Sequence, residues 1–75
     1  MTLKNCEINK DCIVKSINID DARVKLHLNE IGFFVSSKIK VLKKSFLKKT
    51  LLVAVLDSCF AIKSNMAEYI EVEYA

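Results

Sequence analysis

Residues 20–33, with the sequence DDARVKLHLNEIGF, set the division of this chain into structural elements. Two aspartates precede the apolar positions of the segment, and Gly32, the only glycine among 75 residues, follows them. A carboxylate at a helix start accepts a hydrogen bond from a free backbone N–H, and a glycine at the stop adopts the left-handed conformation without a Cβ clash. The segment therefore predicts a helix over residues 22–31, with Leu28 and Ile31 on its buried face and Gly32 closing it.

Apolar residues outside this segment mostly recur at every second position, which is typical of strands with one buried face. We expect strands over residues 12–19, 37–43, 50–56, 59–63 and 70–74. The apolar run from Leu51 to Leu56 predicts a strand buried on both faces or lying at a barrel's seam. Five short strands, with one short helix after the first, predict a mainly β fold, a small SH3-like barrel.

The connecting segments are predicted from turn and cap residues. Residues 3–10 are expected to form an extended lead-in anchored by Leu3 and Ile8, and Asp57 with Ser58 should turn the chain between two strands. Ser64 or Asn65 can cap a single helical turn before the last strand.

The length bounds what such a fold can contain. Seventy-five residues allow a single domain, residues 1–75, and a domain this small buries about 60% of its unfolded surface, which leaves little room for a catalytic cleft. The N-terminus lacks the apolar core of a signal peptide, and no apolar run approaches the roughly 20 residues that cross a bilayer as a helix. We therefore expect a protein of the cytoplasm, including the inner face of the membrane.

Catalytic and cofactor chemistry has no candidate residues in this sequence. No serine lies in a strained nucleophile elbow, His27 is the only histidine, and there is no glycine-rich phosphate loop. Cys6, Cys12 and Cys59 cannot all pair and form no Cys-x-x-Cys, so we expect reduced, structural thiols. The alternatives for the cysteines are a soft-metal site that includes His27, and a reactive thiol. The prediction is a chain that is not an enzyme, with no cofactor and no metal site.

Charge is unevenly distributed along the chain. Residues 1–30 carry five basic and five acidic side chains, residues 31–56 carry six lysines and no acid, and residues 57–75 carry one lysine and four acids. The candidate partner-binding residues are the lysines of this basic segment and the apolar pair among them: Lys38, Lys40, Lys43, Lys44, Phe46, Leu47, Lys48 and Lys49. A solvated face, docking on an acidic protein surface, and weak contact with an anionic membrane surface are the three interpretations. Nucleic-acid binding would rest on charge alone, and we do not expect it.

The order of apolar positions resembles the FeoA family of ferrous-iron transport proteins. The resemblance rests on Leu28, Ile31-Gly32-Phe33, Ile39-x-Val41, Val53-x-Val55, Ala61-Ile62-Lys63 and Ala67-x-x-Ile70-x-Val72, and covers nearly the whole chain. The chain departs from the family pattern where glycine is usual: Asn9-Lys10 precedes the first strand, Val35-Ser36 replaces a proline and a glycine, and a glycine of the later hairpin is absent near Asp57-Ser58.

The resemblance implies an SH3-like domain that acts as a non-enzymatic accessory protein of ferrous iron uptake. Its implied partner is the cytoplasmic part of a membrane GTPase transporter of the FeoB type, whose activity it would modulate, and homo-oligomers are compatible with it. A metal-responsive regulatory SH3-like module and a nucleic-acid-binding small barrel are the alternatives. The resemblance gives structural roles to the apolar signature residues Leu28, Ile31, Gly32, Ile39, Val41, Ala61, Ile62, Ala67, Ile70 and Val72.

Overall fold

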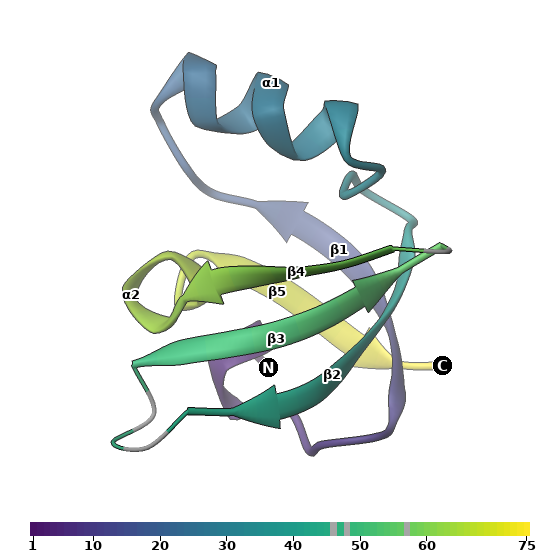
Figure 1. Ribbon diagram of the computed structural model, residues 1–75. Coiled ribbons are helices and arrows are strands. Elements are labelled where there is room, and N and C mark those ends of the chain that lie inside the picture. The colour runs from purple at the N-terminus through teal and green to yellow at the C-terminus, as the bar shows by residue number, and fades with distance from the viewer. Residues whose placement is uncertain (46, 48, 57) are drawn as a thin grey trace.

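The computed structural model describes residues 1–45, 47, 49–56 and 58–75, and it is built on one strongly bent antiparallel sheet (Figure 1). The elements are a 3₁₀ helix η1 (Leu3–Asn5), β1 (Asp11–Ile17), α1 (Ala22–Glu30), β2 (Lys38–Lys44), β3 (Thr50–Val55), β4 (Ser58–Lys63), α2 (Ser64–Ala67) and β5 (Ile70–Tyr74). The strand order across the sheet is β4-β3-β2-β1-β5. Five strands with one helix after the first confirm the predicted mainly β class.

The predicted closure into a barrel is wrong. β4 and β5 are the two ends of the strand order and do not pair with each other. The outer edge of β5 is already occupied, because Thr2 forms an isolated bridge with Glu71 and the N–H of Val72 donates to the Met1 carbonyl at 2.9 Å. Since closure requires a hydrogen-bonded ladder between the first and last strands, the N-terminal residues keep the sheet open at this edge.

The predicted helix and its two ends are confirmed. The Asp21 carboxylate accepts a hydrogen bond from the backbone N–H of Arg23 at 2.9 Å, and α1 begins at the next residue after Asp21. Gly32 has a φ of +88°, and the N–H groups of Gly32 and Phe33 donate to carbonyls of the last helical turn at 3.1 and 2.8 Å. This pair of backward bonds is the Schellman arrangement, in which the left-handed residue allows the terminal carbonyls to be satisfied. Leu28 is buried and Ile31 is half-buried.

The core lies between the inner face of the bent sheet and the segments that cover it. Its buried side chains come from every strand, from η1 and from the loop after α1, and include Leu3, Phe33, Ile39, Leu51 and Ile70. The Phe33 ring meets Phe60 edge to face, with 5.9 Å between ring centroids. Aromatic pairs in this geometry add about 0.5–1.5 kcal/mol beyond the area that they bury.

The expectation that residues 50–56 are buried on both faces is wrong. Leu51, Val53 and Val55 point into the core, while Leu52 is 37% exposed and Leu56, just after β3, is 82% exposed. The sheet is a single layer here, so the alternation of strand side chains places every second residue of the apolar run on the outer face. This strand therefore presents leucine to solvent.

Two local predictions near the ends of the chain also need correction. Residues 3–5 form η1 rather than an extended lead-in; Leu3 is an anchor of the core as predicted, but Ile8 is 43% exposed. The helical turn α2 forms as expected, but its N-cap is Lys63, without a side-chain hydrogen bond from Ser64 or Asn65. The Ser64 N–H at the start of α2 donates to the carbonyl of Lys49, the residue before β3, at 2.9 Å.

Several residues other than glycine adopt left-handed backbone conformations. Asn9, Ser36, Leu47 and Leu56 have φ values of 65°, 79°, 66° and 55°. Asn9 belongs to the pair Asn9-Lys10 and Ser36 to the pair Val35-Ser36, which the resemblance places where the family usually has glycine, and Leu56 adjoins the hairpin position where a family glycine is absent. A side chain in this region costs about 1–2 kcal/mol, and asparagine tolerates it best. Leucine therefore stores strain at two exposed positions.

Candidate docking surface

The basic surface predicted from the sequence is built on β2 and β3 and on the loop between them. Residues 38–63 contain seven lysines and a single acid, Asp57, which lies outside the described residues together with Phe46 and Lys48. The structure can therefore place the remaining candidates, and it divides them into three groups.

Lys38 and Lys40 form the first group, on the outer face of β2. The register of β2 with β1 brings both lysines beside Asp11. One carboxylate oxygen of Asp11 lies 3.4 Å from the Lys38 Nζ, and the other lies 3.6 Å from the Lys40 Nζ. The Lys38 side chain is 64% exposed and the Asp11 side chain 41%. Long, exposed ion pairs of this kind contribute about 0–1 kcal/mol, so Asp11 holds the two ammonium groups only loosely.

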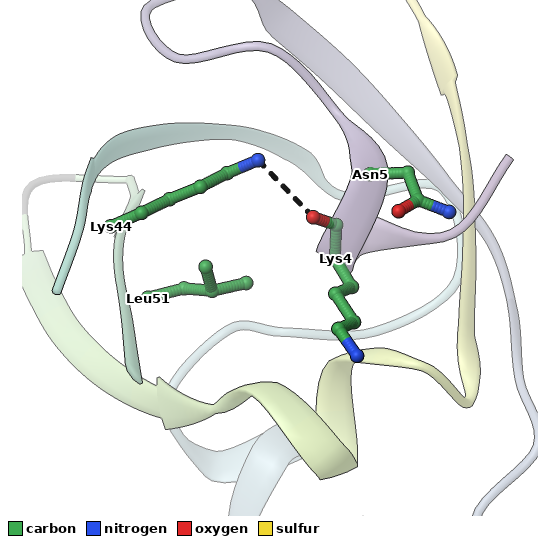
Figure 2. A pocket seen from close by; sticks show the side chains of 4 residues that line it. All are labelled: Lys4, Asn5, Lys44 and Leu51. Carbon is green, nitrogen blue, oxygen red and sulfur yellow. Dashed lines mark hydrogen bonds between the residues drawn. The ribbon is translucent and has the colours of Figure 1, made fainter. Parts of the chain in front are cut away.

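Lys44 forms the second group, because it leaves the basic face. The register of β2 against β3 shifts between Val41 and Lys43, and this irregularity turns Lys44 toward the N-terminal segment. Its Nζ donates to the Lys4 carbonyl at 3.2 Å (Figure 2). Together with Asn5 and Leu51, these two lysines line a hollow of about 350 Å³. The predicted continuous face of lysines is therefore interrupted at the end of β2.

Lys43, Leu47 and Lys49 form the third group, and all three are exposed. Neither Lys43 nor Lys49 makes an ion pair with another residue of the described part of the chain. Leu47 is 67% exposed and has the left-handed backbone described above. These residues surround the β2–β3 loop, where the sequence predicted an apolar pair between lysines.

A second feature of the outer face was not predicted. A hollow of about 410 Å³, which we call the outer hollow, lies over β2 and β3 and is lined by Asp11, Lys38, Ile39, Lys40, Leu42, Ala54 and Leu56. Its lining combines four apolar residues with three charged ones. The signal that could have revealed it is the pairing of Lys40 with Ala54, which puts a small residue beside a lysine on the outer face.

The signature positions of the family are mostly in the core. Leu28, Ile39, Val41, Ile62, Ala67, Ile70 and Val72 are buried, and Gly32 and Ile31 are half-buried. Ala61 is the exception, because it lies on the outer face of β4 and is exposed. It pairs with Leu52 of β3.

The cysteines are free thiols in two different environments. Cys6 and Cys12 are buried and Cys59 is exposed. Burial, with a smaller contribution from the neighbouring Cys12 side chain, raises the pKa of the Cys6 thiol to about 12. Across residues 1–45, 47, 49–56 and 58–75, no three side chains of His, Cys, Asp or Glu converge as a metal site would require. His27 is exposed on α1.

The fold and these surfaces define a small antiparallel β-sheet domain with a basic, partly apolar outer face. A model of the FeoA domain matches residues 1–74, and the chain belongs to this family. FeoA proteins are associated with ferrous iron transport. Comparison with curated proteins finds no relative of significant similarity. No helix among the described residues is long and apolar enough to span a bilayer.

Solved structures of similar fold agree with this assignment. Iron(II) transport protein A from Clostridium thermocellum has a TM-score of 0.89 at 18% identity, covering 99% of this chain and 45% of that one. FeoA from Stenotrophomonas maltophilia, a prokaryotic SH3 domain protein solved with zinc, has a TM-score of 0.79 at 25% identity, covering 97% and 89%. The chain thus spans less than half of the first protein and most of the second, and its open sheet is SH3-like.

A protein with a different role shares the same fold. A manganese-dependent transcriptional repressor has a TM-score of 0.87 at 21% identity. The match covers 100% of this chain and 41% of the repressor chain. At this identity the likeness establishes a shared fold and no more.

Proposed function

We propose that this protein is an accessory component of ferrous iron uptake that binds the cytoplasmic part of a FeoB-type membrane GTPase transporter and modulates its activity. The observation that carries the proposal is the FeoA match over residues 1–74, which leaves one residue of the chain unmatched. A domain of this size with shallow surface hollows suits binding better than catalysis. The proposed location is the cytoplasm, at the inner face of the membrane where such a transporter is reached.

The exposed part of the predicted surface supports a partner contact. Lys43 and Lys49 carry charge without an ion-pair partner among the described residues, and Leu47 offers an apolar side chain between them in sequence. Lys38 and Lys40 add charge on the outer face of β2, whereas Lys44 is directed at Lys4 and contributes little. Phe46 and Lys48 belong to the same proposed contact on sequence grounds alone. An exposed apolar side chain with a basic rim fits an acidic protein surface.

The test is direct binding. The purified chain is titrated with the recombinant cytoplasmic part of the transporter by calorimetry at low and high salt, and GTP hydrolysis is followed in parallel. We expect saturable one-to-one binding that weakens with salt, together with a change in hydrolysis rate. Absence of binding at both salt concentrations would refute the proposal.

A metal-responsive regulatory module is the second candidate, and the repressor-like fold favours it. In that case the chain would associate with a regulator or with itself when manganese or iron(II) is added. Size-exclusion chromatography with and without metal separates the two candidates, because the accessory role predicts no metal-dependent change in the free chain.

A further inference from the structure

We propose that the outer hollow over β2 and β3 is a docking site for an acidic amphipathic segment of a protein partner, which inserts an apolar side chain against Leu56 and places a carboxylate beside Lys38 and Lys40. The inference rests on the proposed function in one respect, namely that the partner is a protein. It moves the centre of the contact from the β2–β3 loop, where sequence reasoning put it, to the outer face of the sheet.

The apolar side of the outer hollow is unusual for a free surface. Leu42, Ala54 and Leu56 line it, and Leu56 is 82% exposed. Leu56 also has a φ of 55°, a conformation that glycine or asparagine adopts at lower cost. This strained, exposed leucine is not among the residues of the hydrophobic core. Backbone strain and exposure at one residue point to a role in contact with another molecule.

The charged side of the outer hollow specifies the chemistry of that molecule. Lys38 and Lys40 both face Asp11, at 3.4 and 3.6 Å, and so one carboxylate serves two ammonium groups. A second carboxylate brought by a partner would complete the charge balance, and it would be held more strongly once the apolar contact excludes water. The site therefore selects an apolar side chain with an acidic neighbour.

A protein segment fits the site better than a membrane does. Lipid-binding surfaces gather about four to eight basic residues, each worth about 1 kcal/mol near an anionic leaflet. The outer hollow has two lysines, and Asp11 lies between them. Its volume of about 410 Å³ and its lining of four apolar residues beside charged groups match the small apolar centre and polar rim of a protein interface.

The experiment compares matched variants in binding to the cytoplasmic part of the transporter at low salt. Leu56→Asn removes the apolar group and suits the left-handed backbone; its control is Leu26→Gln, at a leucine of α1 that is 60% exposed and lies outside the outer hollow. Asp11→Asn removes the competing carboxylate; its control is Glu73→Gln, which removes an acid from another long, exposed pair, 3.5 Å from Lys15. Circular dichroism and thermal melting check that each variant is folded.

We expect Leu56→Asn to weaken binding about tenfold or more, as for an apolar anchor at the centre of an interface, with Leu26→Gln unchanged. Asp11→Asn should tighten binding about two- to fivefold at low salt, and Glu73→Gln should have little effect. Equal affinities for parent, Leu56→Asn and Asp11→Asn would overturn the proposal while the proposed function stands. Loss of binding in Leu26→Gln alone would also overturn it, since it would place the contact on α1.

A second measurement keeps the proposal testable if the transporter does not bind. The isotopically labelled chain is titrated with a synthetic peptide of alternating leucine and glutamate, and with phosphatidylglycerol vesicles, while amide shifts are recorded. Peptide-induced shifts confined to β2 and β3 around Leu42, Ala54 and Leu56 support the site, and their absence refutes it. Binding to vesicles that is lost in Leu56→Asn would replace the protein partner with a membrane surface.

Discussion

Replacing Gly32 tests the helix stop on which the fold prediction was based. Gly32 has a φ of +88°, and a Cβ built on it would lie 2.9 Å from Leu56 Cδ1 and 3.5 Å from Val55 Cγ1. Two separate penalties are possible at this position: backbone strain, which any L side chain incurs, and a steric contact with the Leu56 side chain. The substitution series Gly32→Asn, Gly32→Ala and Gly32→Val separates them.

The structure indicates that backbone strain dominates. The left-handed conformation costs about 1–2 kcal/mol for alanine, less for asparagine and more for valine. The 2.9 Å contact involves the end of a flexible side chain that is 82% exposed, so it can rotate away at small cost, and the 3.5 Å distance is an ordinary contact. A loss of about 1–2 kcal/mol is a large share of the roughly 3–5 kcal/mol that a domain of this size has in total.

The assay is urea unfolding followed by circular dichroism, with thermal melting as a second measure. We expect stability to fall in the order Gly, Asn, Ala, Val, with the alanine variant melting about 4–15 °C lower. In a Leu56→Ala background the cost of Gly32→Ala should change by less than about 0.5 kcal/mol, because the contact is the minor term. A larger cost for asparagine than for alanine would refute the reasoning, since only a steric clash ranks them in that order.

Four other perturbations test the structure. Ser36→Gly should raise stability by up to about 1 kcal/mol in urea unfolding, because it relieves the strain of a φ of 79°. Ser37→Ala should lower it by about 1–3 kcal/mol, since the buried Ser37 hydroxyl donates to the Gly32 carbonyl at 2.8 Å and accepts from the Phe34 N–H at 2.9 Å. Iodoacetamide should label Cys59 in the folded chain at pH 8 and reach Cys6 and Cys12 only after denaturant is added, as mass spectrometry will report. Burial raises the pKa of Cys6 from 9.0 to about 12. The stability contributed by the buried, protonated thiol is therefore complete below pH 9 and is lost as the pH rises from 9 to 12. Over this range the free energy of unfolding of the parent should fall faster than that of Cys6→Ala.

The fold could be predicted as far as local signals reach. Helix α1 was found from a capping aspartate and a terminal glycine, because these residues act within one turn of chain. Barrel closure could not be predicted, since it depends on whether β5 is free to pair with β4, and the backbone of Met1 and Thr2, at the opposite end of the sequence, occupies that edge. No periodicity within a strand reports on such a distant neighbour.

The positive charge of the candidate surface could be predicted from the sequence, but the arrangement of its lysine side chains could not. Composition located six lysines in residues 31–56, but a register shift in β2 turned Lys44 to Lys4, and pairing with β1 brought Asp11 beside Lys38 and Lys40. Both effects are tertiary. The run Leu51–Leu56 misled in a different way, because a strand made only of apolar residues gives no sign of which alternate set faces out.

The left-handed residues connect the departures from the family pattern with the proposed docking site. Asn9 and Ser36 belong to the segments where the family resemblance expects glycine, and each tolerates a positive φ through a short polar side chain. Leu56 adopts a similar backbone angle with an apolar side chain that is 82% exposed and lines the outer hollow. If the turn alone mattered, glycine or asparagine would serve it with less strain and better solubility. Leucine at this position is therefore explained by what it contacts in a complex, and a Leu56→Asn chain should be the more stable and the weaker binder.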